Sequence, residues 1–177
     1  MEDEQGTDAW RHPIEVRPIG VVRSPRVEAT DDDWGAVAAT IELDAERFTP
    51  DVVAGLDGFS HVEVVFVFHG VDEDAVTLGA RHPRGNTDWP AVGILAQRAK
   101  ARPNRLGVTV CTLAGVDGLR LSVRGLDAID GTPVLDVKPY MTEFAPGGAT
   151  TQPAWSTELM RDYWAVGGAP GGRTGGG

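Results

Sequence analysis

The segment HVEVVFVF, residues 61–68, constrains the fold more than any other part of this chain. Its β-branched and aromatic residues favour a strand, and its apolar character on nearly both faces is typical of a central one. Further strands are expected at 14–22, 36–43, 92–96, 107–113, 119–123 and 134–138. Turn-forming glycines recur between them, at Gly115, Gly118, Gly125 and Gly131. The spacing predicts a closed or nearly closed antiparallel barrel.

The chain as a whole is predicted to be mainly β, with one domain and few helices. Its 177 residues are 41% hydrophobic, enough for one core. A short helix interrupted by Pro50 is expected within 44–55, and a C-terminal helix within 153–164. In the latter, Trp155, Leu159 and Tyr163 recur at every fourth position, which predicts a packing face. The expected division is a flexible tail at 1–13, a barrel domain at 14–147, a helical extension at 148–166 and a glycine-rich tail at 167–177.

Composition excludes several classes of protein. The chain has 16 basic and 26 acidic residues, a net charge of −10, which argues against a surface that binds nucleic acid all over. The single cysteine, Cys111, excludes an internal disulfide and a multi-cysteine zinc site. The N-terminus lacks the order of a signal peptide, and no apolar run is long enough to cross a bilayer. A cytoplasmic protein with no metal and no membrane contact is expected.

The segment 81–105 stands apart from this acidic background. It carries six basic residues and one acidic residue, a local net charge of +5. Such segregation costs self-repulsion unless an anion compensates it, and arginine side chains suit carboxylates and phosphates. Within it, Pro103 stiffens the sequence Arg102–Pro103–Asn104. The alternative interpretation is a solvated loop with surface ion pairs.

Two other polar groups are candidates for a site. Asp136 and Lys138 would share one face of a strand that precedes Tyr140, either as a structural ion pair or as the rim of a polar pocket. The glycine turn at 126–132 holds Asp127 and Asp130, which either form a plain turn or receive an ammonium or ribose hydroxyls. No dinucleotide-binding glycine motif, phosphate loop or nucleophile elbow is present, so the residues alone do not define a reaction class.

Five blocks of sequence, in this order, resemble the TsaA-like or TrmO family. They lie at 17–25 (RPIGVVRSP), 55–61 (GLDGFSH), 93–107 (GILAQRAKARPNRLG), 127–133 (DAIDGTP) and 136–140 (DVKPY). The resemblance covers about residues 15–146. It implies a β-barrel methyltransferase that uses S-adenosyl-L-methionine and works as a homodimer, with the cofactor near the subunit interface. Characterised members methylate N6 of threonylcarbamoyl-adenosine next to the tRNA anticodon.

The resemblance also implies roles for individual residues. The implied cofactor contacts are His69, Gly70, Arg98, Leu126, Asp127, Ala128 and Ile129. The implied transfer site is shaped by the family's other polar residues, Arg102, Asn104, Asp136, Lys138 and Tyr140.

Two features separate this chain from the tRNA-modifying members. Bacterial members carry an additional C-terminal domain, whereas one helix-like segment and a glycine tail follow residue 147 here. The segment 28–33 (EATDDD) is also strongly acidic. Two alternatives therefore stand beside tRNA: the same cofactor chemistry on a small-molecule acceptor, or a non-catalytic barrel that binds the cofactor.

Overall fold

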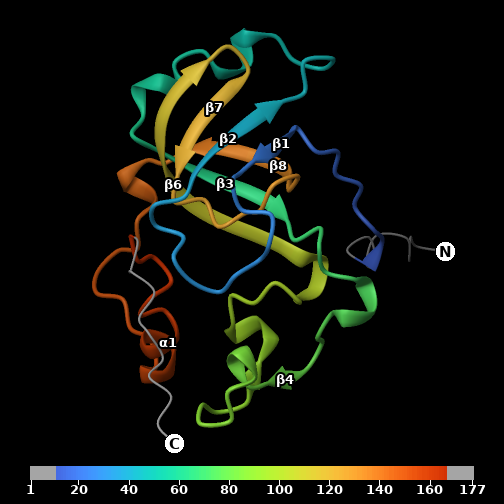
Figure 1. Ribbon diagram of the computed structural model, residues 1–177, viewed down its shortest axis with the longest axis vertical. Coiled ribbons are helices and arrows are strands. Elements are labelled where there is room, and N and C mark those ends of the chain that lie inside the picture. Colours follow the sequence, from blue (N-terminus) through green and yellow to red (C-terminus); the bar gives the residue numbers. More distant parts are fainter. Residues whose placement is uncertain (1–10, 167–177) are drawn as a thin grey trace, which may run out of the picture.

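A six-stranded closed barrel forms the body of the protein (Figure 1). The computed structural model describes residues 11–166. Each strand pairs antiparallel with its neighbours in the order β1-β2-β7-β6-β3-β8. The strands are β1 (Gly20–Arg23), β2 (Ala38–Leu43), β3 (His61–Val67), β6 (Leu106–Asp117), β7 (Arg120–Arg124) and β8 (Pro133–Pro139). The predicted mainly β barrel is confirmed.

The barrel interior is an apolar core built by alternation along the strands. In β3 the residues Val62, Val64 and Phe66 are fully buried, and the residues between them are half-buried. Alternate side chains of a strand point to opposite faces, so one set fills the barrel and the other lies on its outside. The predicted central position of this strand is confirmed, because β3 pairs along its length with both β6 and β8.

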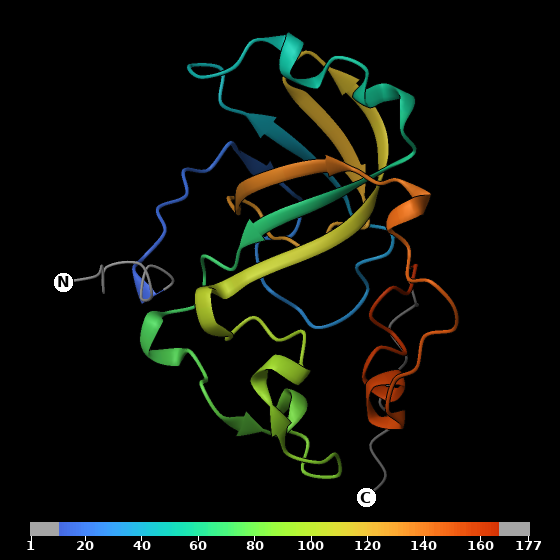
Figure 2. The same ribbon diagram turned by 180° about the vertical axis from the view of Figure 1, so that it is seen from behind.

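A long excursion separates β3 from β6. Residues 68–105 leave the barrel and form a small hairpin of β4 (Ala80–Arg81) and β5 (Val92–Gly93). In both views this excursion and α1 (Ala154–Leu159) lie toward the same end of the barrel (Figures 1 and 2). The remaining elements are 3₁₀ turns at Pro50–Val53, Leu56–Gly58, Glu73–Ala75, Pro83–Gly85, Ile94–Ala96, Pro103–Arg105 and Thr142–Phe144.

Several predicted boundaries need correction. The first strand begins at Gly20 rather than residue 14; Ile14 is 85% exposed and lies outside the barrel. The expected strand 92–96 pairs only over Val92–Gly93 and then turns into a 3₁₀ helix. The helix sought within 44–55 is reduced to a 3₁₀ turn that starts at Pro50, since proline suits a first helical position.

Two further predictions agree with the structure only in part. Gly118, Gly125 and Gly131 adopt positive φ at turns, as expected, but Gly115 lies inside β6, where the register with β7 shifts. The C-terminal helix begins after Pro153 but ends at Leu159, short of residue 164. Most of the expected N-terminal tail and all of the glycine-rich tail lie outside the described residues. Within 11–166 no helix is long and apolar enough to cross a membrane.

Close packing at one glycine gives a test of the barrel. A Cβ added at Gly107 would lie 2.4 Å from the Phe66 ring, which is buried in the core. We expect Gly107→Ala to lower the free energy of unfolding by about 1–3 kcal/mol, the usual cost of overpacking. Urea denaturation measures it.

The matched control is Gly115→Ala, in the same strand, where an added Cβ meets open space. Its effect should stay within about 0.5 kcal/mol. Equal stability of the two variants would contradict the packing described here.

Candidate functional site

The candidate site lies along an open edge of β6. This strand pairs with β3 from Leu106 to Thr112, but with β7 only from Thr112 onward. The edge of residues 106–111 that faces away from β3 therefore has no strand partner within the described residues. A side chain contacts this edge instead, because Arg98 Nη2 donates to the Val108 carbonyl. The next residue, Thr109, points into the barrel, and its Oγ1 donates to Asp127 Oδ1.

Asp127 is the best-connected acid of the site. Besides Thr109, it accepts a hydrogen bond on Oδ2 from the Tyr163 hydroxyl, at 2.5 Å. Burial and the negative charge of Asp127 raise the pKa of Tyr163, while the charges of Arg98 and Arg84 act in the opposite direction. The phenol therefore stays protonated and donates, and both guanidinium groups lie within electrostatic reach of it.

Two of the sequence-implied cofactor residues, Arg98 and Asp127, contact β6, and a third, His69, lies near the end of the loop that holds Asp127. His69 follows β3, and its Nε2 lies 3.9 Å from the position of a Cβ added at Gly131, the glycine that ends the loop holding Asp127. Arg98 donates a hydrogen bond to Val108 and Asp127 accepts one from Thr109, the next residue of β6. Gly70 is exposed beside His69.

The remaining loop residues present their backbone rather than their side chains. Leu126 and Ala128 are 0% and 3% exposed and belong to the barrel core. The Ile129 carbonyl accepts a hydrogen bond from the Thr132 amide. Asp130, the second acid of this turn, accepts from the Ser24 amide at 3.0 Å and so ties the loop to the chain after β1.

The predicted transfer residues on β8 lie on the outside of the barrel. Asp136 pairs in register with Val65 of β3, which pairs with Val108 of β6, so the three form one row across the sheet. Lys138 donates to Asp136, and that hydrogen bond and charge raise the pKa of the lysine. At its other end this row reaches Val108, whose carbonyl Arg98 contacts. The Asp136–Lys138 ion pair and the open edge of β6 therefore lie on one side of the barrel.

Tyr140, Arg102 and Asn104 have mainly local contacts. The Tyr140 amide donates to the His61 carbonyl, which continues the ladder past β8. Arg102 Nη1 donates to the Gln97 carbonyl at 3.0 Å and closes the loop of the basic segment. Asn104 has a φ of 62°, a conformation that asparagine tolerates better than most residues. Their part in transfer stays a prediction.

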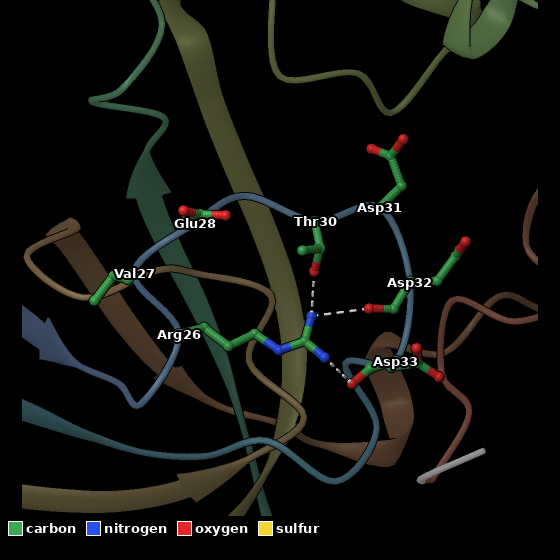
Figure 3. A pocket seen from close by; sticks show the side chains of 7 residues that line it. All are labelled: Arg26, Val27, Glu28, Thr30, Asp31, Asp32 and Asp33. Atoms are coloured by element: carbon green, nitrogen blue, oxygen red, sulfur yellow. Dashed lines mark hydrogen bonds between the residues drawn. The ribbon is translucent and has the colours of Figure 1, made fainter. Parts of the chain in front are cut away.

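The acidic segment 28–33 compensates part of the basic segment. Arg84 donates to Asp32 Oδ1 at 2.8 Å and lies 3.9 Å from the Asp31 carboxylate. Arg26 holds the same loop from inside, donating to Thr30, to the Asp32 carbonyl and to the Asp33 carbonyl (Figure 3). The cavity of about 550 Å³ beside this loop is lined by Arg26, Val27, Glu28, Thr30, Asp31, Asp32 and Asp33. It is separate from the residues at β6.

Only some of the other cations of the basic segment are paired with a carboxylate. Arg105 faces Glu73 at 3.5 Å, but Arg98 and Arg102 donate only to carbonyls. Lys100 makes no hydrogen bond or ion pair to any residue between 11 and 166. The positive charges of Arg98, Lys100 and Arg102 therefore remain available to an anionic ligand. The alternative interpretation, surface ion pairs, holds for Arg84 and Arg105.

Neither cysteine nor metal chemistry is apparent at this site. Cys111 is 2% exposed, and burial, with the charge of Asp127, raises its pKa to about 12, so it stays a neutral thiol. In the described part of the chain no three His, Cys, Asp or Glu side chains gather as metal ligands.

Sequence reasoning missed two residues of the site. Thr109 is an inward residue of a strand, and nothing in the local pattern sets it apart. Tyr163 was assigned to a packing face of the C-terminal helix; it lies just beyond α1 and its hydroxyl reaches Asp127. Only the pairing of distant segments in the fold reveals either contact.

Fold and site together define a small antiparallel β-barrel protein with an Arg98–Asp127 site at one barrel edge, unrelated in topology to a doubly wound nucleotide-binding fold. Residues 4–145 match the model of the tRNA-methyltransferase O N-terminal domain. The chain belongs to this TrmO family.

Relatives and solved structures agree with that membership. The chain is 38% identical over 134 residues to the tRNA (adenine(37)-N6)-methyltransferase of Escherichia coli, covering 70% of this chain and 56% of that protein. It is 37% identical over 129 residues to a "Probable S-adenosyl-L-methionine-binding protein" of Methanothermobacter thermautotrophicus, covering 72% and 90%. A crystal structure of TrmO from Pseudomonas aeruginosa superposes with a TM-score of 0.66 at 30% identity, covering 81% and 62%.

The length of the match differs among these proteins. The chain spans about half the length of the first curated relatives it matches, 54% and 56%. What those longer proteins do as a whole is therefore carried to this chain only as a proposal.

Proposed function

We propose that this chain is an S-adenosyl-L-methionine-dependent methyltransferase that methylates N6 of threonylcarbamoyl-adenosine next to the tRNA anticodon. The observation that carries the proposal is the family match over residues 4–145. Several relatives are named tRNA (adenine(37)-N6)-methyltransferases, from Escherichia coli to Homo sapiens. An enzyme with this substrate works where tRNA is, in the cytoplasm.

The chain's own residues fit the cofactor. Its amino-acid end carries a carboxylate and an ammonium group on one carbon, and its ribose carries two hydroxyls. Arg98 supplies a guanidinium with donors beyond the one bonded to Val108, and Asp127 supplies a carboxylate bonded to the next residue of β6. We assign Arg98 to the cofactor carboxylate and Asp127 to the amino group or the ribose hydroxyls. We also assign His69, Gly70 and residues 126–129 to the cofactor, as the family resemblance implies; His69 lies near Gly131, at the end of the loop that holds Asp127.

The chemistry requires positioning more than an activated side chain. The cofactor, when bound, supplies an electrophilic methyl group, and transfer is an in-line displacement in which orientation and exclusion of water carry most of the rate. Asp136 and Lys138 border the other end of the same sheet row, where they can orient the acceptor by hydrogen bonds. Arg102, Asn104 and Tyr140 are assigned to the rim of that transfer site.

A small-molecule acceptor is the second candidate. The acidic loop 28–33 favours it, because Glu28, Asp31 and Asp33 would repel a phosphate backbone that approached from that side. The positive charges of Arg98, Lys100 and Arg102 favour tRNA. A barrel that binds the cofactor without turnover is the third candidate.

We further propose that the chain forms a homodimer through the outside of β6. Leu106, Val108 and Val110 point outward in one row and are 38%, 38% and 41% exposed. A row of exposed apolar side chains on a sheet face marks an interface. We propose that a second copy of the chain covers this face. The same face carries the row Val108–Val65–Asp136, so a partner bound there would exclude water from the transfer site.

Cofactor binding tests the assignment of Arg98. We expect Arg98→Ala to weaken S-adenosyl-L-methionine binding by about tenfold to a hundredfold, the usual worth of a charged hydrogen bond, measured by calorimetry. Lys100→Ala, which removes a neighbouring charge without a bonded donor, should change the affinity by less than about threefold. Equal losses in the two variants would show general electrostatics rather than a specific contact.

The acceptor is tested by salt dependence together with nucleoside analysis. Transfer to tRNA should fall linearly on a plot of log kcat/KM against log salt concentration, because phosphate contacts release counterions. Mass spectrometry of anticodon-loop nucleosides from cells lacking the gene should show loss of the N6-methyl mark. An unchanged nucleoside profile, with activity on small molecules that is independent of salt, would favour the second candidate.

The dimer is tested by a charge placed in the proposed interface. Val110→Asp should convert the dimer to monomer in sedimentation velocity, because a partner would have to bury the carboxylate. Val52→Asp, at a residue 52% exposed on a distant 3₁₀ turn, should leave the dimer intact. A monomeric unmodified chain, or a Val110→Asp variant that still dimerises, would refute the proposed interface.

A further inference from the structure

The C-terminal segment is fastened to the barrel at several points, although it lies beyond residue 145, where the family match ends. The Asp33 and Trp34 amides donate to the carbonyls of Asp162 and Tyr163, at 3.1 and 2.8 Å. A Cβ added at Gly35 would lie 2.2 Å from the Trp164 carbonyl oxygen, so the close approach requires this glycine.

A separate anchor joins the segment to the excursion between β3 and β6. Trp89 Nε1 donates to Glu158 Oε2 at 2.9 Å. This contact lies on α1 and does not involve Asp127, so it can be removed independently of the contact at the site. The segment is thus held both by an anchor remote from the site and by Tyr163 at the site.

Tyr163 and Thr109 each occupy one oxygen of the Asp127 carboxylate. A carboxylate offers about four lone-pair positions, so each oxygen retains one for another donor. The Thr109 hydroxyl comes from a residue only 5% exposed, inside the barrel, and the Tyr163 phenol comes from the C-terminal segment. The carboxylate is therefore fixed from two sides, and its rotation is restricted.

We propose that Tyr163 is a positioning residue that orients Asp127 toward the ammonium group of the cofactor's amino-acid end. This inference rests on the proposed function and extends it to a part of the chain outside the family match. Arg98 bonds to Val108 and Asp127 bonds to Thr109, so a cation and an anion are each held at one of two adjacent residues of β6. A zwitterion, with its carboxylate and ammonium on one carbon, is the ligand end that complements such a pair.

The choice of the ammonium over the ribose follows from charge. Asp127 accepts its two hydrogen bonds from a protonated phenol and a hydroxyl, neither of which carries a positive charge. A half-buried anion of this kind gains more from a cationic partner than from neutral hydroxyls. The C-terminal segment then completes the subsite for the charged end of the cofactor.

A double-mutant cycle tests the positioning role. Calorimetry with S-adenosyl-L-methionine should show that Tyr163→Phe binds about tenfold more weakly than the unmodified chain. In an Asp127→Ala background, Tyr163→Phe should produce no further loss, because the phenol acts through that carboxylate. The remote anchor gives the matched control: Glu158→Ala should lower the melting temperature but leave the affinity within about twofold.

A truncated ligand separates positioning from a merely structural role. 5′-Methylthioadenosine keeps the nucleoside and lacks the amino-acid end, so its affinity should be the same for Tyr163→Phe and the unmodified chain. Equal weakening of both ligands, additive losses in the cycle, or an affinity unchanged by Tyr163→Phe would each overturn the inference while leaving the proposed function intact. No binding of S-adenosyl-L-methionine to the unmodified chain would instead overturn the proposed function, and this inference with it.

Discussion

The difference in length between β6 and β7 is the constraint on which the site depends. β6 has 12 residues and β7 has 5, so β7 can pair with only one half of its neighbour. An unpaired strand edge exposes backbone groups that need partners. Here Arg98 supplies a donor to one of those carbonyls, and the loop after β7 brings Asp127 against the adjacent residue. The barrel therefore closes at one end with hydrogen-bonded strands and at the other with polar side chains.

Much of the barrel follows from the sequence because its signals are local. The β-branched run of β3 has a period of two and an unusual content of apolar residues, and Gly118 sits at the tight turn that joins β6 to β7. The boundaries were less predictable where a strand ends for lack of a partner. Residues 14–19 alternate as a strand would, yet the ladder of β1 with β2 and β8 begins only at Gly20. An alternating pattern shows which residues could form a strand, but they pair only where a neighbouring strand lies beside them.

The site could be predicted only in part, and for a physical reason. The resemblance pointed to Arg98 and Asp127, and the structure brings them to one strand edge. Several contacts at and near the site join residues that are far apart in the chain: Tyr163 lies 36 residues from Asp127, and Arg84 lies 52 residues from Asp32. Such contacts leave no periodicity in the sequence, since each depends on a single pair of side chains. The acidic segment 28–33 is explained in the same way: the carboxylates of Asp31 and Asp32 face Arg84, and the backbone carbonyls of Asp32 and Asp33 accept hydrogen bonds from Arg26.

The charge distribution has a consequence for the acceptor. A net charge of −10 keeps most of the surface unattractive to nucleic acid, and the acidic loop strengthens this on one side. Arg98, Lys100 and Arg102, which no carboxylate neutralises among residues 11–166, concentrate positive charge in one short stretch near the open edge of β6. Such a surface suits a short single-stranded loop with splayed bases better than a long duplex, because few phosphates need to be contacted at once. An anticodon loop has that form, so the charge distribution of the described residues is compatible with the tRNA acceptor proposed above.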